Sequence, residues 1–327
     1  MIHSPNLIER EFLRKKLYNS YIIFHFDQLK SLYSTKYRYE DTLNTKIRHL
    51  AIRYIFNKNM TKTYDDDPVF ITSDSPLAKK QLFDDLTKTQ MLLDDDKAKE
   101  FIKHLEIILM QCSKQVKQMN LADDDLPTIT ENNEIRYKHL IFQDFSNLAK
   151  KFPKYIHYAV ALQIRYTYLH LQNHGLAREF NRMNFIPTDS ITEGFATAFD
   201  HYFDKYCSPF PDLETPFGST GSFFSVSTWD TDIIYINPPF DETLIECTIN
   251  HVYEQLKVER KKRRYIFTLP NWNHFPALEH LKLCYWLNEI KTFKKGHLNF
   301  INYYAIHGDP VEIAPCDIVE ITLMSSK

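Results

Sequence analysis

The second part of the chain most constrains the fold, because the pattern of apolar and turn-forming residues changes near residue 186. Beyond that point, short apolar runs bounded by Pro, Gly, Asp and Asn alternate with helix-like stretches. Strands and helices that alternate at this spacing predict an α/β fold with a parallel, doubly wound sheet. The predicted strands are 190–195, 223–226, 233–236, 265–269 and 317–323, and the predicted helices between them are 197–207, 242–256 and 278–289.

The first half of the chain is predicted to be helical, because its apolar residues recur at steps of three and four. The predicted helices are 6–32, 39–57, 96–119, 135–151 and 153–174, and the last of them carries Arg165, interpreted as a snorkelling side chain. Three aspartate runs, 65–67, 94–96 and 123–125, predict solvated loops or helix N-termini. We therefore expect a helical domain over 1–185 and an α/β domain over 186–327.

Composition limits the class of protein. The net charge of −2 means that any nucleic-acid binding must come from a local basic surface. The five cysteines are scattered, without a CxxC pair or a nearby His at ligand spacing, which argues against a metal site and fits a reducing compartment. The N-terminus lacks the apolar core of a signal peptide, and no window approaches the roughly 20 apolar residues of a membrane span. We expect a soluble intracellular protein, in nucleus or cytoplasm or of viral origin.

The predicted strand 233–236 is followed directly by Asn237, Pro238, Pro239 and Phe240. Open α/β folds bind ligands at the carboxyl edge of the sheet, where this tetrapeptide is expected to lie. The Asn237 side-chain carbonyl and the Pro238 backbone carbonyl can accept the two hydrogens of an adenine amine and localise its lone pair, while Phe240 stacks on the base. This arrangement suits methylation of the amine. A methyl donor that carries its methyl group on a sulfonium is already activated, so no strong general base is needed and alignment supplies most of the catalysis. The alternative is a plain X-Pro-Pro turn that ends a strand.

Two further segments suit a cofactor. Gly218 and Gly221 are two of only six glycines, and hydroxyl residues flank them, so backbone N–H groups there can approach a carboxylate or a ribose. Taken alone, Gly-Ser-Thr-Gly is more often a plain turn. Residues 193–200 form a predicted strand that runs into a small-residue loop, the kind of junction at which nucleotide-like cofactors bind.

Five motifs occur in an order and spacing that resemble the phosphorylated CTD-interacting factor family: Glu-Gly-Phe-Ala (193–196), Ser-Pro-Phe-Pro-Asp (208–212), Phe-Gly-Ser-Thr-Gly-Ser-Phe (217–223), Asn-Pro-Pro-Phe-Asp-Glu (237–242) and Leu-Pro-Asn-Trp (269–272). The resemblance covers about residue 155 to the C-terminus. It implies a helical domain packed on a Rossmann-like class I methyltransferase domain that binds S-adenosyl-L-methionine (AdoMet). Such enzymes methylate the N6 amine of the adenosine next to the 7-methylguanosine cap of mRNA.

The resemblance also implies which residues form the site. Asn237 to Phe240 would be the catalytic tetrapeptide. The implied cofactor-binding residues are Gly194, Phe195, Ala196, Asp200, Phe217, Gly218, Ser219, Gly221, Ser222, Asn237 and Glu242. The sequence departs from the family in three ways: no WW-domain pattern is visible at the N-terminus, Asp200 stands where family members often have Asn, and the C-terminus is short. Recruitment to the phosphorylated polymerase tail is therefore unsupported, and one cofactor contact is in doubt.

RNA contacts are expected at two basic clusters. Lys261, Lys262, Arg263 and Arg264 form the stronger run, and Lys294 with Lys295 forms a second. Lys and Arg bind phosphates, but the first run can equally be a solvated helix end. Trp272 is a candidate platform for a base or the cap, with core packing as the equal alternative.

The predicted function is AdoMet-dependent N6-methylation of the cap-adjacent adenosine of mRNA, with the capped RNA 5′ end as partner and no protein partner identified. Two alternatives stay open. One is an adenine methyltransferase that acts on DNA or on internal RNA, and the other is an inactive methyltransferase fold that serves as an RNA-binding scaffold. The intact Asn237 argues against the inactive scaffold.

Overall fold

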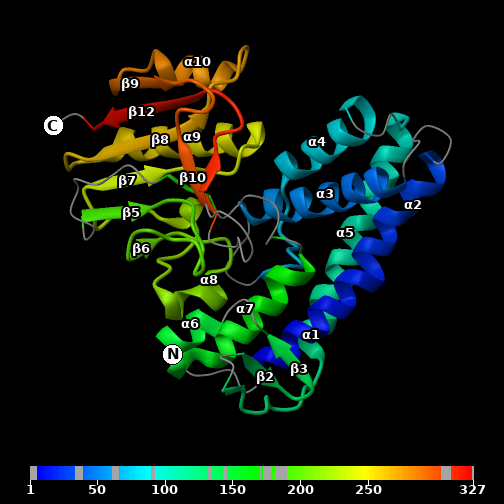
Figure 1. Ribbon diagram of the computed structural model, residues 1–327. Coiled ribbons are helices and arrows are strands. Elements are labelled where there is room, and N and C mark those ends of the chain that lie inside the picture. Colours follow the sequence, from blue (N-terminus) through cyan, green and yellow to red (C-terminus); the bar gives the residue numbers. More distant parts are fainter. Residues whose placement is uncertain are drawn as a thin grey trace. The chain divides into compact units, whose positions relative to one another are not determined.

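A computed structural model of the chain describes residues 6–33, 40–60, 66–89, 93–131, 134–142, 146–169, 171, 178–180, 190–302 and 311–325. The chain divides into two compact units, Met1–Leu126 and Pro127–Lys327 (Figure 1). The boundary predicted between residues 185 and 186 lies outside the described residues, whereas the second unit begins at Pro127. None of the described helices is both long and apolar enough to cross a membrane.

The first unit is built from helices. They are α1 (Leu7–Leu17), a π-helical turn (Tyr18–Ile23), α2 (Phe24–Tyr33), α3 (Glu40–Asn59), α4 (Pro76–Asp84), a second π turn (Asp85–Thr89) and α5 (Asp95–Gln118). The helices predicted over 6–32 and 96–119 are confirmed. On α5, Leu105, Leu109, Cys112 and Val116 are buried at steps of three and four, which produces one apolar face. The short helix α4 was not predicted, and it begins where the Ser75 side chain accepts from the Ala78 amide and Pro76 takes the first position.

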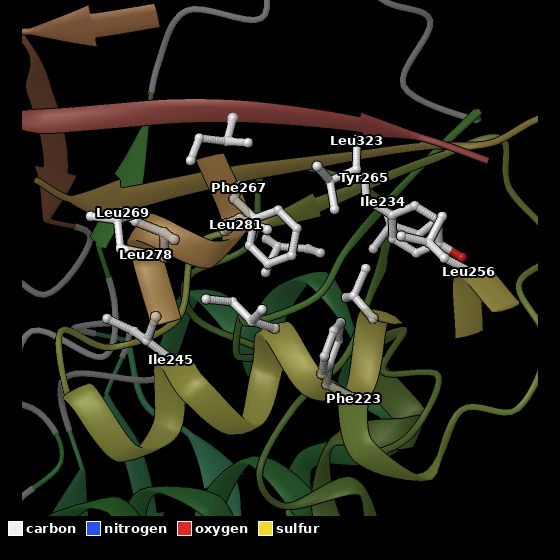
Figure 2. Close-up of a cluster of buried hydrophobic side chains, with 14 of the residues drawn as sticks. Phe223, Ile234, Ile245, Leu256, Tyr265, Phe267, Leu269, Leu278, Leu281 and Leu323 are labelled. Atoms are coloured by element: carbon white, nitrogen blue, oxygen red, sulfur yellow. The ribbon is translucent and has the colours of Figure 1, made fainter. Parts of the chain in front are cut away.

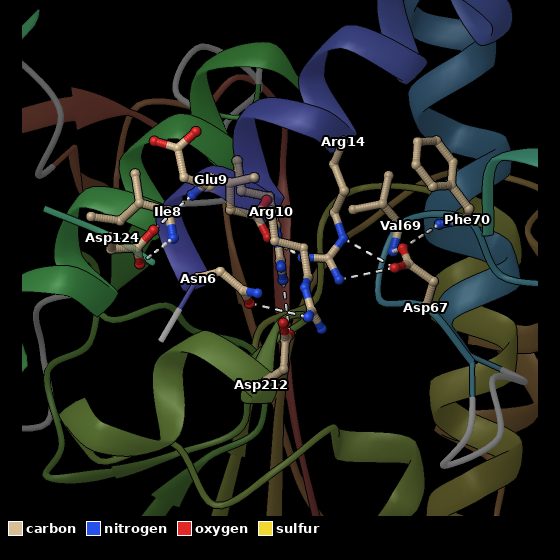
Figure 3. Close-up of polar contacts among 12 residues, drawn as sticks. Asn6, Ile8, Glu9, Arg10, Arg14, Asp67, Val69, Phe70, Asp124 and Asp212 are labelled. Atoms are coloured by element: carbon tan, nitrogen blue, oxygen red, sulfur yellow. Dashed lines mark hydrogen bonds and ion pairs between the residues drawn. The ribbon is translucent and has the colours of Figure 1, made fainter. Parts of the chain in front are cut away.

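A buried ion pair lies inside this unit (Figure 3). Arg14 of α1 donates to Asp67 from Nε at 3.0 Å and from Nη2 at 2.9 Å, and Asp67 also accepts from the amides of Val69 and Phe70. Although burial alone would raise the pKa of Asp67, the Arg14 charge and these hydrogen bonds hold it below its usual value. The interpretation of the 65–67 run as a solvated loop is thus wrong for Asp67, and residue 65 lies outside the described residues.

Aspartates of the other two runs cap helices. Asp94 accepts from the Lys97 amide at 2.9 Å and begins α5. Asp124 accepts from the amides of Ile8 and Glu9 at 2.8 and 3.0 Å, at the start of α1. Both carboxylates meet the unpaired N–H groups of a helix N-terminus, as expected for a favourable interaction with the helix dipole.

The second unit contains a six-stranded sheet of order β6-β5-β7-β8-β12-β9. Its strands are β5 (Ile191–Glu193), β6 (Lys205–Tyr206), β7 (Ile233–Ile236), β8 (Arg264–Pro270), β9 (Leu287–Phe293) and β12 (Ile318–Met324). β6, β5, β7 and β8 are parallel, but β12 runs antiparallel to both β8 and β9. The α/β class is confirmed, whereas the expectation of a wholly parallel sheet is wrong for β12.

One face of this sheet packs against α9 (Glu242–Val258) and α10 (Pro276–Lys282) (Figure 2). Ile245, Ile249, Val252 and Leu256 form the buried stripe of α9. On β8, Tyr265, Phe267 and Leu269 point to this face and Ile266 to the other, because side chains alternate along a strand. The helical stripe and the strand alternation together form one apolar core.

The opposite face carries a second core cluster. Ile233, Tyr235 and Ile266 of the sheet pack there with Leu298 and Phe300. Phe300 belongs to a three-stranded sheet of order β11-β10-β4, formed by Val311–Ile313, Asn299–Asn302 and Arg178–Phe180. A third sheet joins β1 (Thr128–Ile129), β2 (Ile135–Tyr137) and β3 (Leu140–Phe142). These two small sheets were not predicted from the sequence.

Four predicted elements differ from the structure. Residues 135–142 form the β2–β3 hairpin, turned at Lys138 with φ +53°, and residues 146–151 form α6 (Ser146–Lys151). Residues 197–207 form a tight turn and β6, because the Thr197 hydroxyl accepts from the Phe199 and Asp200 amides and competes with a helix. Residues 223–225 form a 3-10 turn in place of a strand. The helix predicted over 278–289 ends at Lys282, and the chain then enters β9.

Candidate active site

The strand order reverses beside β5, which lies between β6 and β7. Ligands of open α/β sheets bind where the order reverses, at the carboxyl ends of the strands. Gly194 directly follows β5 and Asn237 directly follows β7, so two of the predicted segments lie at neighbouring strand ends. The Gly194 amide donates to the Tyr235 carbonyl at 2.7 Å and extends the pairing of the two strands to this edge.

Gly194 stands where no side chain fits. A Cβ built there would lie 2.9 Å from the Phe223 ring and 3.3 Å from the Tyr235 carbonyl oxygen. Phe195 packs on the same ring, with centroids 4.8 Å apart, and the Ala196 amide donates to the Cys207 carbonyl at 3.0 Å. The backbone at 194–196 is therefore held closely between neighbouring strands, without bulky side chains of its own at Gly194 and Ala196.

The following loop is held by two buried carboxylates. The Ala198 amide donates to Glu214 at 2.6 Å, and the Tyr202 amide donates to Glu193 at 3.0 Å. Asp200 is 3% exposed and closes the tight turn with Thr197 through two backbone hydrogen bonds of 3.1 Å. Neither glutamate was predicted as a site residue, although Glu193 opens the Glu-Gly-Phe-Ala motif and Glu214 lies three residues before Phe217.

The glycine-containing loop lies against β6. Gly218 and Gly221 have φ of +114° and +125°, the left-handed region that favours glycine. The Ser219 hydroxyl lies 2.7 Å from that of Ser208, and the Thr220 amide donates to the Tyr206 carbonyl at 2.8 Å. These contacts bring 218–221 to the strand that neighbours β5, at the same carboxyl edge.

Phe217 and Ser222, the predicted cofactor contacts at the two ends of this loop, differ in burial. Phe217 is buried, and its ring packs edge-on to Phe152 and Tyr155 at 5.5 and 6.2 Å. Phe217 is thus part of the core beneath the loop. Ser222 is half-buried and begins the 3-10 turn at Phe223.

The tetrapeptide forms a turn between β7 and α9. Pro238 is buried, and Asn237, Pro239 and Phe240 are half-buried. The Pro239 carbonyl accepts from the Asp241 amide at 2.7 Å, and the Asp241 side chain caps α9 by accepting from the Leu244 amide at 2.9 Å. Glu242, the first residue of α9, is exposed. The turn is therefore anchored at its start by a buried strand and at its end by a capped helix.

Two aromatic rings fix the position of Phe240. The ring lies edge-on to Trp272 at 6.4 Å and to Phe300 at 6.3 Å, with interplanar angles of 81° and 84°. Trp272 follows β8 and is half-buried. The structure thus places Trp272 beside the tetrapeptide, and Trp272 also packs against the core, with its ring 6.0 Å from that of Phe275.

The stronger basic run lies elsewhere. Lys261, Lys262 and Arg264 are exposed, but they precede or begin β8, so they lie at the amino edge of the sheet, opposite the tetrapeptide. Arg263 is only 5% exposed and donates to the Thr231 carbonyl at 2.9 Å, to the Trp229 carbonyl and to Glu259. The expectation that Arg263 is a surface RNA contact is wrong, because its guanidinium holds the fold together.

The second basic cluster is better placed. β9 runs parallel to β8, and Phe293 and Pro270 both pair with Ile318, so Lys294 and Lys295 emerge at the same edge as Trp272. Both lysines are exposed, Lys294 lies 2.9 Å from Asp317, and the Lys295 amide donates to Asp317 at 2.9 Å.

A buried polar cluster on α7 (Ile156–Tyr168) and residues 212–214 holds the loops at 197–200 and 208–222 in place. Arg165 on α7 is fully buried, donates to Asp212 at 2.8 Å and lies 5.0 Å from the centre of the Phe210 ring. The interpretation of Arg165 as a snorkelling side chain is therefore wrong. Glu214 is also fully buried and accepts from the Tyr166 hydroxyl at 3.0 Å, and burial raises the pKa of Glu214 to about 8.

Within the described part of the chain, no group of three or more His, Cys, Asp or Glu side chains is placed to hold a metal ion. The chemistry available at this edge is that of backbone amides and carbonyls, the carboxamides of Asn237 and Asn271, buried carboxyl groups and aromatic rings. Such a site can bind a nucleoside-like cofactor and orient a planar base.

Comparisons of the sequence with known proteins identify the family. A family model described as "Phosphorylated CTD interacting factor 1 WW domain" matches residues 137–302, which run from β2 to β10. Two curated relatives, from Mus musculus and Homo sapiens, are each named mRNA (2′-O-methyladenosine-N(6)-)-methyltransferase. Each is 32% identical over 85 residues, which are 26% of this chain and 12% of the relative. Because the family model matches half of the sequence, this chain belongs to the phosphorylated CTD interacting factor 1 family.

Proposed function

We propose that this chain is an AdoMet-dependent methyltransferase that modifies the N6 amine of an adenosine in RNA, namely the first transcribed adenosine beside the mRNA cap. The observation that carries the proposal is the adjacency of Gly194 and Asn237 at neighbouring strand ends, where the strand order reverses. The names of the mouse and human relatives supply the reaction, although the match spans only 12% of their length.

The residues at this edge fit AdoMet. At Gly194 a Cβ would overlap the Phe223 ring and the Tyr235 carbonyl, so the backbone there carries no side chain, and the positive φ of Gly218 and Gly221 turns the backbone of the second loop at the same edge. The cofactor would lie against 194–200 and 218–222, in the Rossmann-like manner, where the buried Glu193 and Glu214 hold the first loop. When bound, AdoMet supplies an electrophilic methyl group on a sulfonium.

The tetrapeptide would prepare the adenine. The Asn237 carboxamide oxygen and the Pro238 carbonyl oxygen accept the two amine hydrogens and turn the nitrogen lone pair toward the methyl group. The Phe240 ring stacks on the base, and its edge-on contacts with Trp272 and Phe300 keep its plane fixed. Rate enhancement then comes from alignment, together with the exclusion of water from a half-buried turn.

Replacement of Asn237 by Ala tests the role of the carboxamide. We expect methyl transfer to fall by about 100-fold to 1,000-fold, because one of the two oriented acceptors is lost. AdoMet affinity, measured by calorimetry, should fall far less than methyl transfer, since the loops 194–200 and 218–222 are unchanged and Asn237 is only one of the implied cofactor contacts. The matched control is Asn250→Ala on the exposed face of α9, which should leave both quantities unchanged. Full transfer activity in Asn237→Ala would contradict the proposal.

The substrate is tested by mass spectrometry of RNA after incubation with isotopically labelled AdoMet. Capped RNA that starts with adenosine should gain one methyl group at N6, and uncapped RNA and DNA of the same sequence should gain far less. Equal methylation of uncapped RNA or of DNA would show that the enzyme does not require the cap and would contradict the cap-adjacent adenosine as its specific target. Absence of AdoMet binding by the purified chain would instead indicate an inactive scaffold.

A further inference from the structure

β9 forms one edge of the six-stranded sheet (Figure 1). It pairs with β12 on one side, and no strand among the described residues pairs with its other side. Residues 288–292 are all exposed, and the strand is seven residues long, whereas β6 at the opposite edge has two residues. An exposed edge of this length presents a row of N–H and C=O groups to which another strand can add.

Edge strands are commonly protected by charges and by bulges, and β9 has both. Its register with β12 shifts between Thr322 and Leu323, and Glu289 and Lys291 lie within the strand. The two charges flank Ile290, and their alternation with Ile290 puts both on one face of the sheet, with Ile290 on the other. Within one copy, Lys291 lies 3.0 Å from Glu289 and 3.9 Å from Glu320, so pairing with a second copy would add cross-strand partners to these contacts. A single charge on an edge strand would repel the same charge on a second copy. Two opposite charges placed symmetrically about one residue are different, because in antiparallel pairing each charge faces the opposite charge of the second copy.

We propose that β9 pairs antiparallel with β9 of a second copy of this chain, about a twofold axis at Ile290. In this register, Glu289 of each copy faces Lys291 of the other, and the two Ile290 side chains face each other. Directly opposed residues in a sheet interact, so two opposite-charge pairs and one apolar pair stabilise the junction.

The residues that precede β9 extend the surface. Leu283 and Tyr285 are 83% and 84% exposed, although both are large and apolar in part. In antiparallel pairing, they approach the far end of β9 of the other copy, where they add apolar area to the strand pair. The resulting interface is still small, so we expect a reversible dimer with a dissociation constant on the order of 10 µM.

Sedimentation velocity over a range of concentrations tests the dimer, with charge variants as the diagnostic. Glu289→Lys places lysines at both 289 and 291, and Lys291→Glu places glutamates at both. Each single variant should weaken self-association by about tenfold or more, because both cross-strand pairs become like-charged. The double variant Glu289→Lys/Lys291→Glu should restore self-association, and an equimolar mixture of the two single variants should form mixed dimers.

Lys99→Glu, an exposed charge reversal on α5, is the matched control and should not change self-association. Circular dichroism and thermal unfolding of each variant check that it is folded, and mixed-dimer formation shows in addition that both single variants keep a competent strand. An original chain that sediments as a monomer up to about 0.1 mM would overturn the proposal. So would single variants that associate as strongly as the original, or a double variant that is no better than the single ones.

Discussion

At the scale of single residues, the proposed site depends on a position that has no side chain, Gly194. Gly194 leaves no space for a Cβ beside Phe223 and Tyr235, although its φ is not in the left-handed region. The sequence could show that glycine is rare in this chain, and it placed Gly194 near the end of the predicted strand 190–195. The ring of Phe223, 29 residues later, decides that only glycine fits.

Gly194→Ala should therefore destabilise the chain by about 1–3 kcal/mol, because the overlap with Phe223 and Tyr235 must be relieved by backbone movement. AdoMet affinity should fall in parallel. Urea unfolding and calorimetry measure the two effects. Gly296→Ala is the control: its φ of +87° strains an alanine by about 1 kcal/mol, but nothing lies within 4 Å, so AdoMet affinity should not change.

Glu214 should make stability depend on pH. Burial raises the pKa of Glu214 to about 8, so the folded chain binds a proton that the unfolded chain releases near pH 4.5. The stabilisation is complete below pH 4.5 and is lost as the pH rises through 8, with a slope of at most about 1.4 kcal/mol per pH unit.

Glu214→Gln should flatten that part of the profile, and urea unfolding between pH 5 and pH 9 measures it. Glu254→Gln, at an exposed position on α9, should leave the profile unchanged. A steep profile that persists in Glu214→Gln would assign the dependence to another group.

At the scale of elements, α9 connects the proposed catalytic turn to the core. Its apolar stripe packs on the sheet, and Asp241 caps its first turn directly after Phe240. Its periodicity was readable from the sequence, and the predicted helix 242–256 is confirmed within two residues at its C-terminal end. The helix predicted over 135–151 is confirmed only at Ser146–Lys151, because a β hairpin takes its first part. The helix predicted over 197–207 is wrong, because the Thr197 hydroxyl bonds the amides that a helix would use.

Asp241→Ala should destabilise the second unit by about 1 kcal/mol, since the N–H of Leu244 loses its acceptor. Asp241→Asn keeps a capping oxygen and should lose only a fraction of that. Urea unfolding distinguishes the two variants. The predicted role of the cap is contradicted if Ala and Asn have the same effect.

At the scale of the whole molecule, two compact units share one chain, and the proposed site lies in the second. The buried Arg14–Asp67 pair belongs entirely to the first. Removal of one partner from a buried pair leaves an uncompensated charge, which is strongly destabilising.

Arg14→Met should thus lower the free energy of unfolding of the first unit by about 3–5 kcal/mol. AdoMet affinity at a temperature at which both units are folded should stay the same. Differential scanning calorimetry should show one transition shifted downward and the other retained. A parallel loss of AdoMet affinity would show that the two units are coupled.

The sequence by itself determined the apolar strand before Asn237, the amphipathic α9 and the tetrapeptide turn, because each is carried by residues close together in the chain. It also determined the family, because each of the five motifs is itself a short continuous segment. Only the tertiary structure decided that β12 is antiparallel, that Arg165 and Arg263 are buried with carboxylate or carbonyl partners, and that Lys294 and Lys295 share the edge of Phe240 and Trp272. Strand direction and the burial of a charge depend on partners tens of residues away. Local periodicity does not record those partners.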